Sequence, residues 1–313
     1  MKKFINEIPV FFAVDDNYIP FLAVTIKSLI SNASSENNYA LKILYTNILE
    51  ENQNKIKKYE NENISIEFVN VSEHVNKITS KLYTRDYFSQ TTYYRLFIPE
   101  LYPEYKKAVY IDSDTVLKAD IAELYNTNMK GYLIGAIPDG GVQSVKAFQD
   151  YVEKVIGVSS YNNYFNAGVI LMNLEELREH RFQDKFLYLL DTVKYSVAQD
   201  QDYLNRICKG RVKYIGSEWN KMPILSDNIN ESDIKLIHYN FAQKPWHSDN
   251  IMYQEYFWQY AKQTEFLDAI NKIKENYTIE DQLKDEEINK ALIELAQKET
   301  DCVGDDIIQW RKE

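Results

Sequence analysis

Two apolar runs of strand length in this chain each end abruptly in aspartates. Ile8–Val14 (IPVFFAV) is followed by Asp15 and Asp16, and Ala108–Ile111 (AVYI) is followed by Asp112-Ser113-Asp114. A short, continuous apolar run is typical of a parallel strand that is buried on both faces. The sequence therefore predicts two strands inside a sheet, with carboxylates standing where each strand leaves the core.

The first half of the chain alternates between strand and helix patterns. After the first run, the spacing of apolar residues predicts a helix in Asn17–Ile30, a strand at Leu41–Tyr45, a helix at Glu50–Tyr59 and a strand at Ile64–Val71. Alternating elements of this kind predict an α/β fold, with a mostly parallel central sheet flanked by helices.

The Asp112-Ser113-Asp114 segment offers two carboxylates to one site. Residues i and i+2 of an extended chain point to the same side, with Cα atoms about 7 Å apart, so both side chains could face one cation. The alternative is a solvated turn, because aspartate favours turns. Ligands of parallel sheets bind beyond the carboxyl ends of the strands, where Asp15 and Asp16 would also lie. We therefore expect one polar site at that edge.

Composition narrows the classes of function. The 313 residues are 45% hydrophobic, which suits a sizeable core in one large domain or two small ones. A net charge of -11 argues against binding nucleic acid or anionic membrane through bulk electrostatics, so an anionic ligand would need a metal or a few local cations. Cys208 and Cys302 indicate free thiols in a reducing cytoplasm. Ile8–Val14 is too short for a signal sequence or a membrane span. We expect a cytoplasmic protein without a strong membrane anchor.

The middle of the chain places polar residues at the ends of further elements. We expect a helix over Thr84–Ile98 that carries Arg95, and a loop at Asp139-Gly140-Gly141. A strand is predicted over Tyr164–Asn173, with Asn166 near its start. An amphipathic segment over Leu174–Leu190 follows, and then a helix that begins near Asp200, Gln201 and Asp202. A lone arginine is usually a surface group. Carboxylates near a helix start often serve as caps, and we interpret Asp202 in that way.

The last third of the chain contains a short strand and an acidic tail. Ile234–Tyr239 is predicted to be a strand that ends near His238, and Lys244 follows within a turn. A single histidine is more often structural than ligating, and a lysine before proline is usually exposed. From Glu275 to Glu313 acidic residues outnumber basic ones and apolar residues recur at helical spacing, which predicts an acidic helical appendage.

Six motifs, taken together and in this order, resemble those of glycosyltransferase family 8. They are Phe12-Ala13-Val14-Asp15-Asp16-Asn17-Tyr18, Thr92-Tyr93-Tyr94-Arg95-Leu96, Tyr110-Ile111-Asp112-Ser113-Asp114, Tyr164-Phe165-Asn166-Ala167-Gly168, Gln199-Asp200-Gln201-Asp202 and His238 to His247. The resemblance implies a GT-A fold, a Rossmann-like α/β catalytic domain that we place at residues 1–270, with the helical appendage at 271–313. It also implies a retaining enzyme that uses Mn²⁺ (or Mg²⁺) and UDP-glucose or UDP-galactose.

The resemblance also implies roles for individual residues. Asp112, Asp114 and His238 would hold the metal, and oxygen ligands with one imidazole suit Mn²⁺. Lys244 would add a second positive charge to the diphosphate. The nucleotide would contact Ala13, Asp15, Asn17, Tyr18 and Ser113, and the donor sugar would contact Arg95, Asn166 and Asp200. Asp139 would lie toward the acceptor, and Gln201 beneath the sugar ring.

Several alternatives remain open at this point. We favour front-face attack, with Gln201 steadying positive charge, over double displacement with Asp200 as the nucleophile. The acceptor is predicted to be a glycan, a glycoprotein or a glycolipid, and an acidic C-terminal segment does not favour docking on anionic lipid. A non-catalytic nucleotide-sugar or glycan-binding protein of the same fold is the main alternative. A nucleotidyltransferase is a weaker one, because no Gly-rich, lysine-bearing segment follows the first strand. The sequence predicts no particular oligomeric state.

Overall fold

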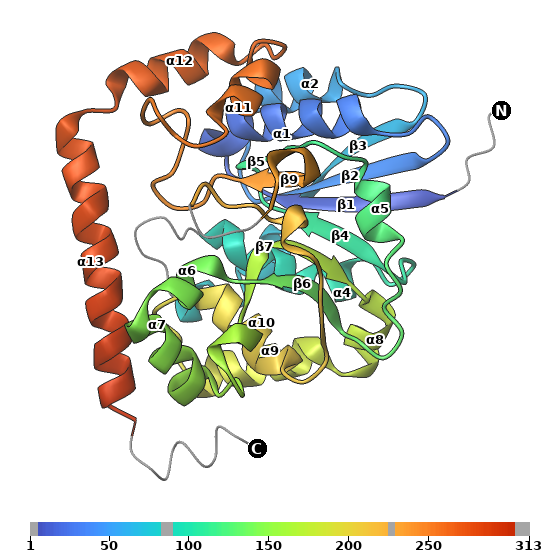
Figure 1. Ribbon diagram of the computed structural model, residues 1–313. Helices are drawn as coiled ribbons and strands as arrows, with labels where there is room; N and C mark the ends of the chain where they lie inside the picture. The colour runs from blue at the N-terminus through green and yellow to red at the C-terminus, as the bar shows by residue number, and fades with distance from the viewer. Residues whose placement is uncertain (1–5, 83–89, 225–228, 304–313) are drawn as a thin grey trace.

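The computed structural model describes residues 6–82, 90–224 and 229–303, and its centre is a seven-stranded sheet (Figure 1). The strands follow the order β3-β2-β1-β4-β7-β6-β8, and β7 alone runs antiparallel to its neighbours. Their bounds are β1 (Glu7–Ala13), β2 (Asn38–Tyr45), β3 (Ile64–Asn70), β4 (Ala108–Ile111), β6 (Ile134–Pro138), β7 (Phe165–Met172) and β8 (Val212–Tyr214). The predicted α/β fold with a mostly parallel sheet is confirmed.

The apolar runs form central strands because both faces of the sheet are covered. Along β1, Val10 and Phe12 pack into one core and Phe11 into the other, and Ile111 and Tyr110 of β4 divide in the same way. The α-helices among the described residues are α1 (Ile19–Asn32), α2 (Glu50–Lys57), α3 (Ser72–Val75), α4 (Ile98–Leu101), α5 (Ile121–Tyr125), α6 (Gly140–Ser144), α7 (Lys146–Tyr151), α8 (Leu174–Glu179), α9 (Phe182–Thr192), α10 (Gln199–Cys208), α11 (Gln254–Ala261), α12 (Leu267–Asn276) and α13 (Ile279–Asp301).

A second, two-stranded sheet brings the Asp112-Ser113-Asp114 turn to a distant part of the chain. Strand β5 (Thr115–Leu117) pairs antiparallel with β9 (Leu236–His238), and Thr115 lies opposite His238 in the register. The backbone N–H of Tyr239 also donates to the carbonyl of Asp114 at 2.9 Å. These pairings fix the position of His238 beside the two aspartates.

Three segments differ from the sequence-based predictions. The predicted helix at 84–98 lies partly outside the described residues, and from Gln90 to Phe97 it is a 3-10 helix that leads into α4. The amphipathic segment is two helices, α8 and α9, because Arg181 between them adopts the left-handed conformation with φ 56°. The loop predicted at Asp139-Gly140-Gly141 is the start of α6, and Asp139 is its N-cap.

Asp202 has the predicted capping role and a second one. Its carboxylate accepts from the backbone N–H of Ala198, the residue before α10, at 2.9 Å. It also accepts from the hydroxyls of Tyr151 at 2.8 Å and Tyr164 at 2.6 Å. Because the side chain is fully buried, burial raises the pKa of Asp202 to about 6, although these hydrogen bonds act to lower it. Asp202 thus joins α7, the start of β7 and α10.

The acidic C-terminal segment is helical from Ile279 to Asp301, as predicted, and its residues 304–313 lie outside the described residues. Figure 1 shows α13 running along the side of the molecule from α12 to α7. The helix begins with a capping box of Thr278 and Asp281, and it buries Leu292, Ala296 and Thr300. Residue 270 lies inside α12, and the division of the chain at that residue stays a prediction. Among the described residues, none of the helices has both the length and the apolar character needed to cross a membrane.

Candidate active site

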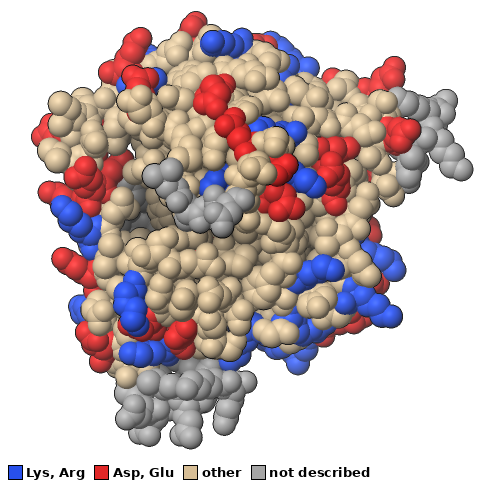
Figure 2. All heavy atoms as spheres, in the orientation of Figure 1, with Lys and Arg blue, Asp and Glu red and all other residues tan. Residues whose placement is uncertain are grey.

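The Asp112-Ser113-Asp114 turn lies where β4 ends, at the edge that the sequence predicted. The hydroxyl of Thr25 in α1 donates toward the carbonyls of Ser113 at 2.8 Å and Thr115 at 2.7 Å. These contacts fix the turn against α1. The turn lines a cavity of about 150 Å³. Ser113 itself is buried. Figure 2 shows acidic and basic side chains interspersed over one face of the molecule.

Asp112 has one carboxylate oxygen held by hydrogen-bonding and charged partners. Its Oδ1 accepts from the hydroxyl of Tyr110 at 2.7 Å and lies 3.1 Å from Nη2 of Arg95. The guanidinium lies over the Tyr110 ring and also pairs with Asp200, whose Oδ2 is 3.1 Å from Nε. Arg95 is only 4% exposed, so the surface role that is usual for a lone arginine is wrong here. The second oxygen of Asp112 is left to face the cavity.

Asp114 is arranged in the same way around a buried lysine. Oδ2 of Asp114 pairs with Nζ of Lys244, which also donates to the carbonyl of Tyr239. Burial alone would raise the pKa of Asp114, but the ammonium of Lys244 opposes burial, and that pKa is held well below its usual range. Oδ1 of Asp114 is buried and accepts no hydrogen bond from the described residues. Lys244 is 4% exposed, so the exposure that is usual for a lysine before proline is also wrong here.

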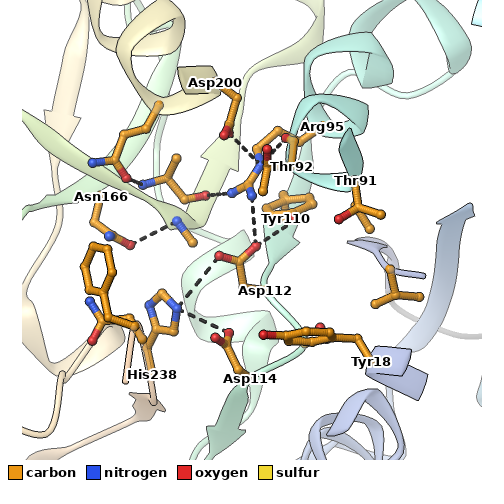
Figure 3. A pocket seen from close by; sticks show the side chains of 18 of the residues that line it. Tyr18, Thr91, Thr92, Arg95, Tyr110, Asp112, Asp114, Asn166, Asp200 and His238 are labelled. Carbon is orange, nitrogen blue, oxygen red and sulfur yellow. Dashed lines mark hydrogen bonds and ion pairs between the residues drawn. The ribbon is translucent and has the colours of Figure 1, made fainter. Parts of the chain in front are cut away.

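The imidazole of His238 faces the two remaining carboxylate oxygens (Figure 3). Its Nε2 lies 3.3 Å from Oδ1 of Asp114 and 3.8 Å from Oδ2 of Asp112. These three side chains each offer a ligand atom, and the atoms lie within 4.8 Å of one another. A carboxylate pair and an imidazole suit a divalent cation such as Mn²⁺, and the unpartnered, buried Oδ1 of Asp114 needs a positive partner. The residues therefore fit a metal ion.

A network of amides continues from the metal-binding candidates toward Asp139. Oδ2 of Asp139 accepts from Asn166 and from Gln201, both at 3.0 Å, while Oδ1 caps α6. The other end of the Gln201 amide accepts from the backbone N–H of Ala167 at 2.9 Å. Asp139 was expected to lie toward an acceptor, but it is buried and both of its oxygens hold other residues. Its carboxylate fixes the orientation of Asn166 and Gln201.

Only some of the predicted nucleotide-binding residues line the cavity. Ala13 and Tyr18 line it, whereas Asp15 and Asn17 are outside its lining. Oδ1 of Asp15 accepts from the backbone N–H groups of Asn17 at 3.0 Å and Tyr18 at 3.3 Å, which caps the short 3-10 helix Asp16–Tyr18. Burial raises the pKa of the Tyr18 hydroxyl, with Lys244 opposing the change. In Figure 3 the Tyr18 ring lies next to Asp114.

Comparison with known proteins shows what kind of protein this is. The family model described as glycosyl transferase family 8 matches residues 9–250. The chain belongs to this family. A Haemophilus influenzae protein, described in general terms as a glycosyltransferase, is 33% identical over 250 residues, which are 76% of this chain and 72% of that protein.

Two further family relatives are informative. An Escherichia coli lipopolysaccharide 1,2-glucosyltransferase is 26% identical over 255 residues, 75% of this chain and 72% of its own length. The crystal structure of galactosyltransferase LgtC in complex with donor and acceptor sugar analogs superposes with a TM-score of 0.68 at 28% identity and covers 82% of this chain and 96% of that chain. The chain is thus a family 8 glycosyltransferase with the GT-A fold.

Sequence reasoning missed several residues of this family 8 site. Tyr110 belongs to one of the six motifs, but the sequence does not predict that its hydroxyl donates to Asp112 or that its ring lies beneath Arg95. Asn220 was not singled out, although it hydrogen-bonds both Asn166 and His238. An alternating position in a buried strand could have indicated Tyr110, whereas no local pattern marks Asn220.

Proposed function

We propose that this protein is a retaining, metal-dependent hexosyltransferase that moves glucose or galactose from a UDP-sugar to an acceptor. The observation that carries the proposal is the convergence of one free atom each from Asp112, Asp114 and His238 beside the buried Lys244. Family 8 membership and relatives named as a glucosyltransferase and a galactosyltransferase support a hexose donor.

The chain's own residues suit the departure of a diphosphate. Breaking the bond from the anomeric carbon to the diphosphate leaves negative charge on the leaving group. Lys244 lines the cavity as a buried ammonium beside Asp114. Its pKa is raised, because Asp114 more than offsets the effect of burial, so it stays charged. A bound Mn²⁺ or Mg²⁺ would supply Lewis acidity and a template for the diphosphate. The donor's charge would thus be balanced inside an otherwise acidic protein.

The nucleotide would lie across β1 and the helix that follows it. Tyr18 offers an aromatic face for the base, and the backbone at Ala13 lines the same cavity. Asp15 and Asn17 stay the candidates for reading polar edges of the ribose or the base. Ser113 would contribute through its backbone, because its side chain is buried.

The sugar would lie against Arg95, Asn166, Asp200 and Gln201. We propose front-face attack by the acceptor, with the leaving phosphate taking the acceptor proton and Gln201 steadying the cationic anomeric centre. Gln201 suits a fixed role because Ala167 and Asp139 hold both ends of its amide. Asp200 is paired with Arg95, and burial raises the pKa of Asp200 to about 6 against the effect of Arg95. Mass spectrometry that detects a sugar ester on Asp200 in a stalled variant would contradict this mechanism.

The acceptor is proposed to be a saccharide, presented as a glycan, a glycoprotein or a glycolipid. Lipopolysaccharide is named for one relative, so a lipid-linked acceptor has a precedent in the family. The helix α13 is acidic, and attraction of this segment to anionic lipid is not expected.

UDP release tests the proposal against its alternatives. With UDP-glucose or UDP-galactose, slow hydrolysis that requires Mn²⁺ and stops on chelation would support a transferase. A protein that binds UDP-sugars tightly but releases no UDP would instead be a non-catalytic binder of the same fold. Diphosphate formed from UTP and a sugar phosphate would indicate a nucleotidyltransferase.

A further inference from the structure

Asn220 touches the side of the His238 ring that faces away from the two aspartates. Its Oδ1 lies 2.9 Å from Nδ1 of His238, and both side chains are buried. Asn220 follows a short 3-10 helix (Ser217–Trp219), and the next residue, Lys221, pairs with Ile237 of β9 in an isolated bridge. The backbone therefore holds Asn220 in register with the strand that carries His238.

The direction of every hydrogen bond in this part of the site follows from two groups whose roles are fixed. The backbone N–H of Gly168 can only donate, and it donates to Oδ1 of Asn166 at 3.0 Å. The carboxylate of Asp139 accepts from the Nδ2 of the same asparagine. Oδ1 of Asn166 must then accept from Nδ2 of Asn220 at 2.9 Å, which leaves Oδ1 of Asn220 for His238. Nδ1 of His238 consequently carries the proton.

We propose that Asn220 is a positioning residue that fixes His238 as the Nδ1–H tautomer, with the lone pair of Nε2 directed at Asp112 and Asp114. The proposal rests on the proposed metal site, and it assigns to Asn220 the task of making His238 a ligand. Partners on the far nitrogen of a ligating histidine commonly fix its tautomer and orientation in this way.

Removal of Asn220 would favour the other tautomer. A buried Nδ1–H without an acceptor is costly, whereas an Nε2–H could donate to Oδ1 of Asp114, which is 3.3 Å away and otherwise accepts no hydrogen bond from the described residues. That hydrogen bond would place a proton where a cation should bind. The loss of one amide would thus weaken metal binding without removing any ligand.

Imidazole ¹⁵N NMR of the metal-free protein tests the tautomer directly. The chain has 4 histidines, so the spectrum of His238→Ala assigns the resonances of His238. We expect the Nδ1–H tautomer in the wild type and the Nε2–H tautomer in Asn220→Ala. An Nε2–H tautomer in the wild type would overturn the proposal.

Titration with Mn²⁺ alone, followed by electron paramagnetic resonance, tests the consequence. Asn220→Ala should weaken Mn²⁺ binding about 10- to 100-fold. Asn220→Asp still offers an acceptor to Nδ1–H, although its second oxygen would face Oδ1 of Asn166, so this variant should bind Mn²⁺ more tightly than Asn220→Ala. In a His238→Ala background, Asn220→Ala should cause no further loss, because both changes act through one ligand.

Three results would count against this role. Unchanged Mn²⁺ affinity in a folded Asn220→Ala variant would overturn it. A double variant whose loss of Mn²⁺ affinity is the product of the two single losses would also overturn it, because Asn220 would then act independently of His238, through general stability. A wild type that binds no Mn²⁺ would overturn the proposed metal site, whereas the NMR result would still decide what Asn220 does to His238.

Discussion

The imidazole of His238 packs directly on the backbone of Gly168. A Cβ atom added at residue 168 would lie 2.3 Å from Cε1 of His238 and 2.8 Å from Oδ2 of Asp112, which is closer than real Cβ contacts allow. Gly168 is in the buried strand β7, between β4 and β6, so the ring must move more readily than the strand. Gly168→Ala should therefore weaken Mn²⁺ binding at least 10-fold in a direct titration.

Gly131→Ala is the matched control for that variant. Gly131 has φ 82° and open space around the position of a Cβ, so alanine is strained there by about 1 kcal/mol but touches nothing. This variant should melt at a slightly lower temperature and bind Mn²⁺ normally. Equal Mn²⁺ affinities in the two variants would show that the packing of His238 on Gly168 does not matter for the metal.

Lys244→Gln should slow UDP release at saturating Mn²⁺ by about 100-fold or more, because the charge that balances the departing diphosphate is lost. Lys146 is a suitable control, since it is on the surface and pairs with Asp150 within α7. Lys146→Gln should have the activity of the wild type. A Lys244→Gln variant that retains its fold and loses less than about threefold in rate would remove Lys244 from the mechanism.

The strand patterns predicted the position of the two aspartates because burial and charge change locally in the sequence. Asp112 and Asp114 follow an apolar run, and that pattern alone places them at the carboxyl edge of a sheet. The position of His238 depends on the pairing of β5 with β9, which no local pattern reveals, so only the family resemblance indicated it. The amide of Asn220 depends on the same long-range pairing and was missed.

Local backbone conformation explains why the predicted amphipathic helix is divided in two. Arg181 adopts the left-handed conformation and so divides the predicted amphipathic segment into two helices, although neither glycine nor proline marks the break.

Arg95 has the sequence context of a surface residue, yet it is buried because Asp112, Asp200 and the Tyr110 ring surround it. A single sequence does not show which distant carboxylates will meet one arginine.

Asp202 should give the protein a measurable pH dependence of stability. Its folded pKa of about 6 is above the ordinary value of 3.8, so the folded state binds more protons between these values. The contribution of this group to stability is therefore full below about pH 4 and is lost as the pH rises through 6, by roughly 3 kcal/mol in total. Relative to wild type, Asp202→Asn should gain unfolding free energy in urea between pH 4.5 and 7. A constant difference would contradict the raised pKa.

Two leucines of α13 test whether the C-terminal helix is part of the folded unit. Leu292 is 8% exposed and packs into the core shared with α7, whereas Leu283 is 54% exposed. Leu292→Ala should lower the unfolding free energy by about 2–4 kcal/mol, and Leu283→Ala by less than about 0.5 kcal/mol. Similar small effects in both variants would show that α13 contributes little to the stability of the domain.

Anomalous diffraction at the manganese edge, from crystals grown with Mn²⁺ and UDP, tests the central claim most directly. We expect one strong peak within coordinating distance of Asp112, Asp114 and His238, next to the diphosphate, and no such peak in crystals of Asp114→Asn. A manganese peak elsewhere, or a bound UDP whose diphosphate lies away from these three side chains, would contradict it.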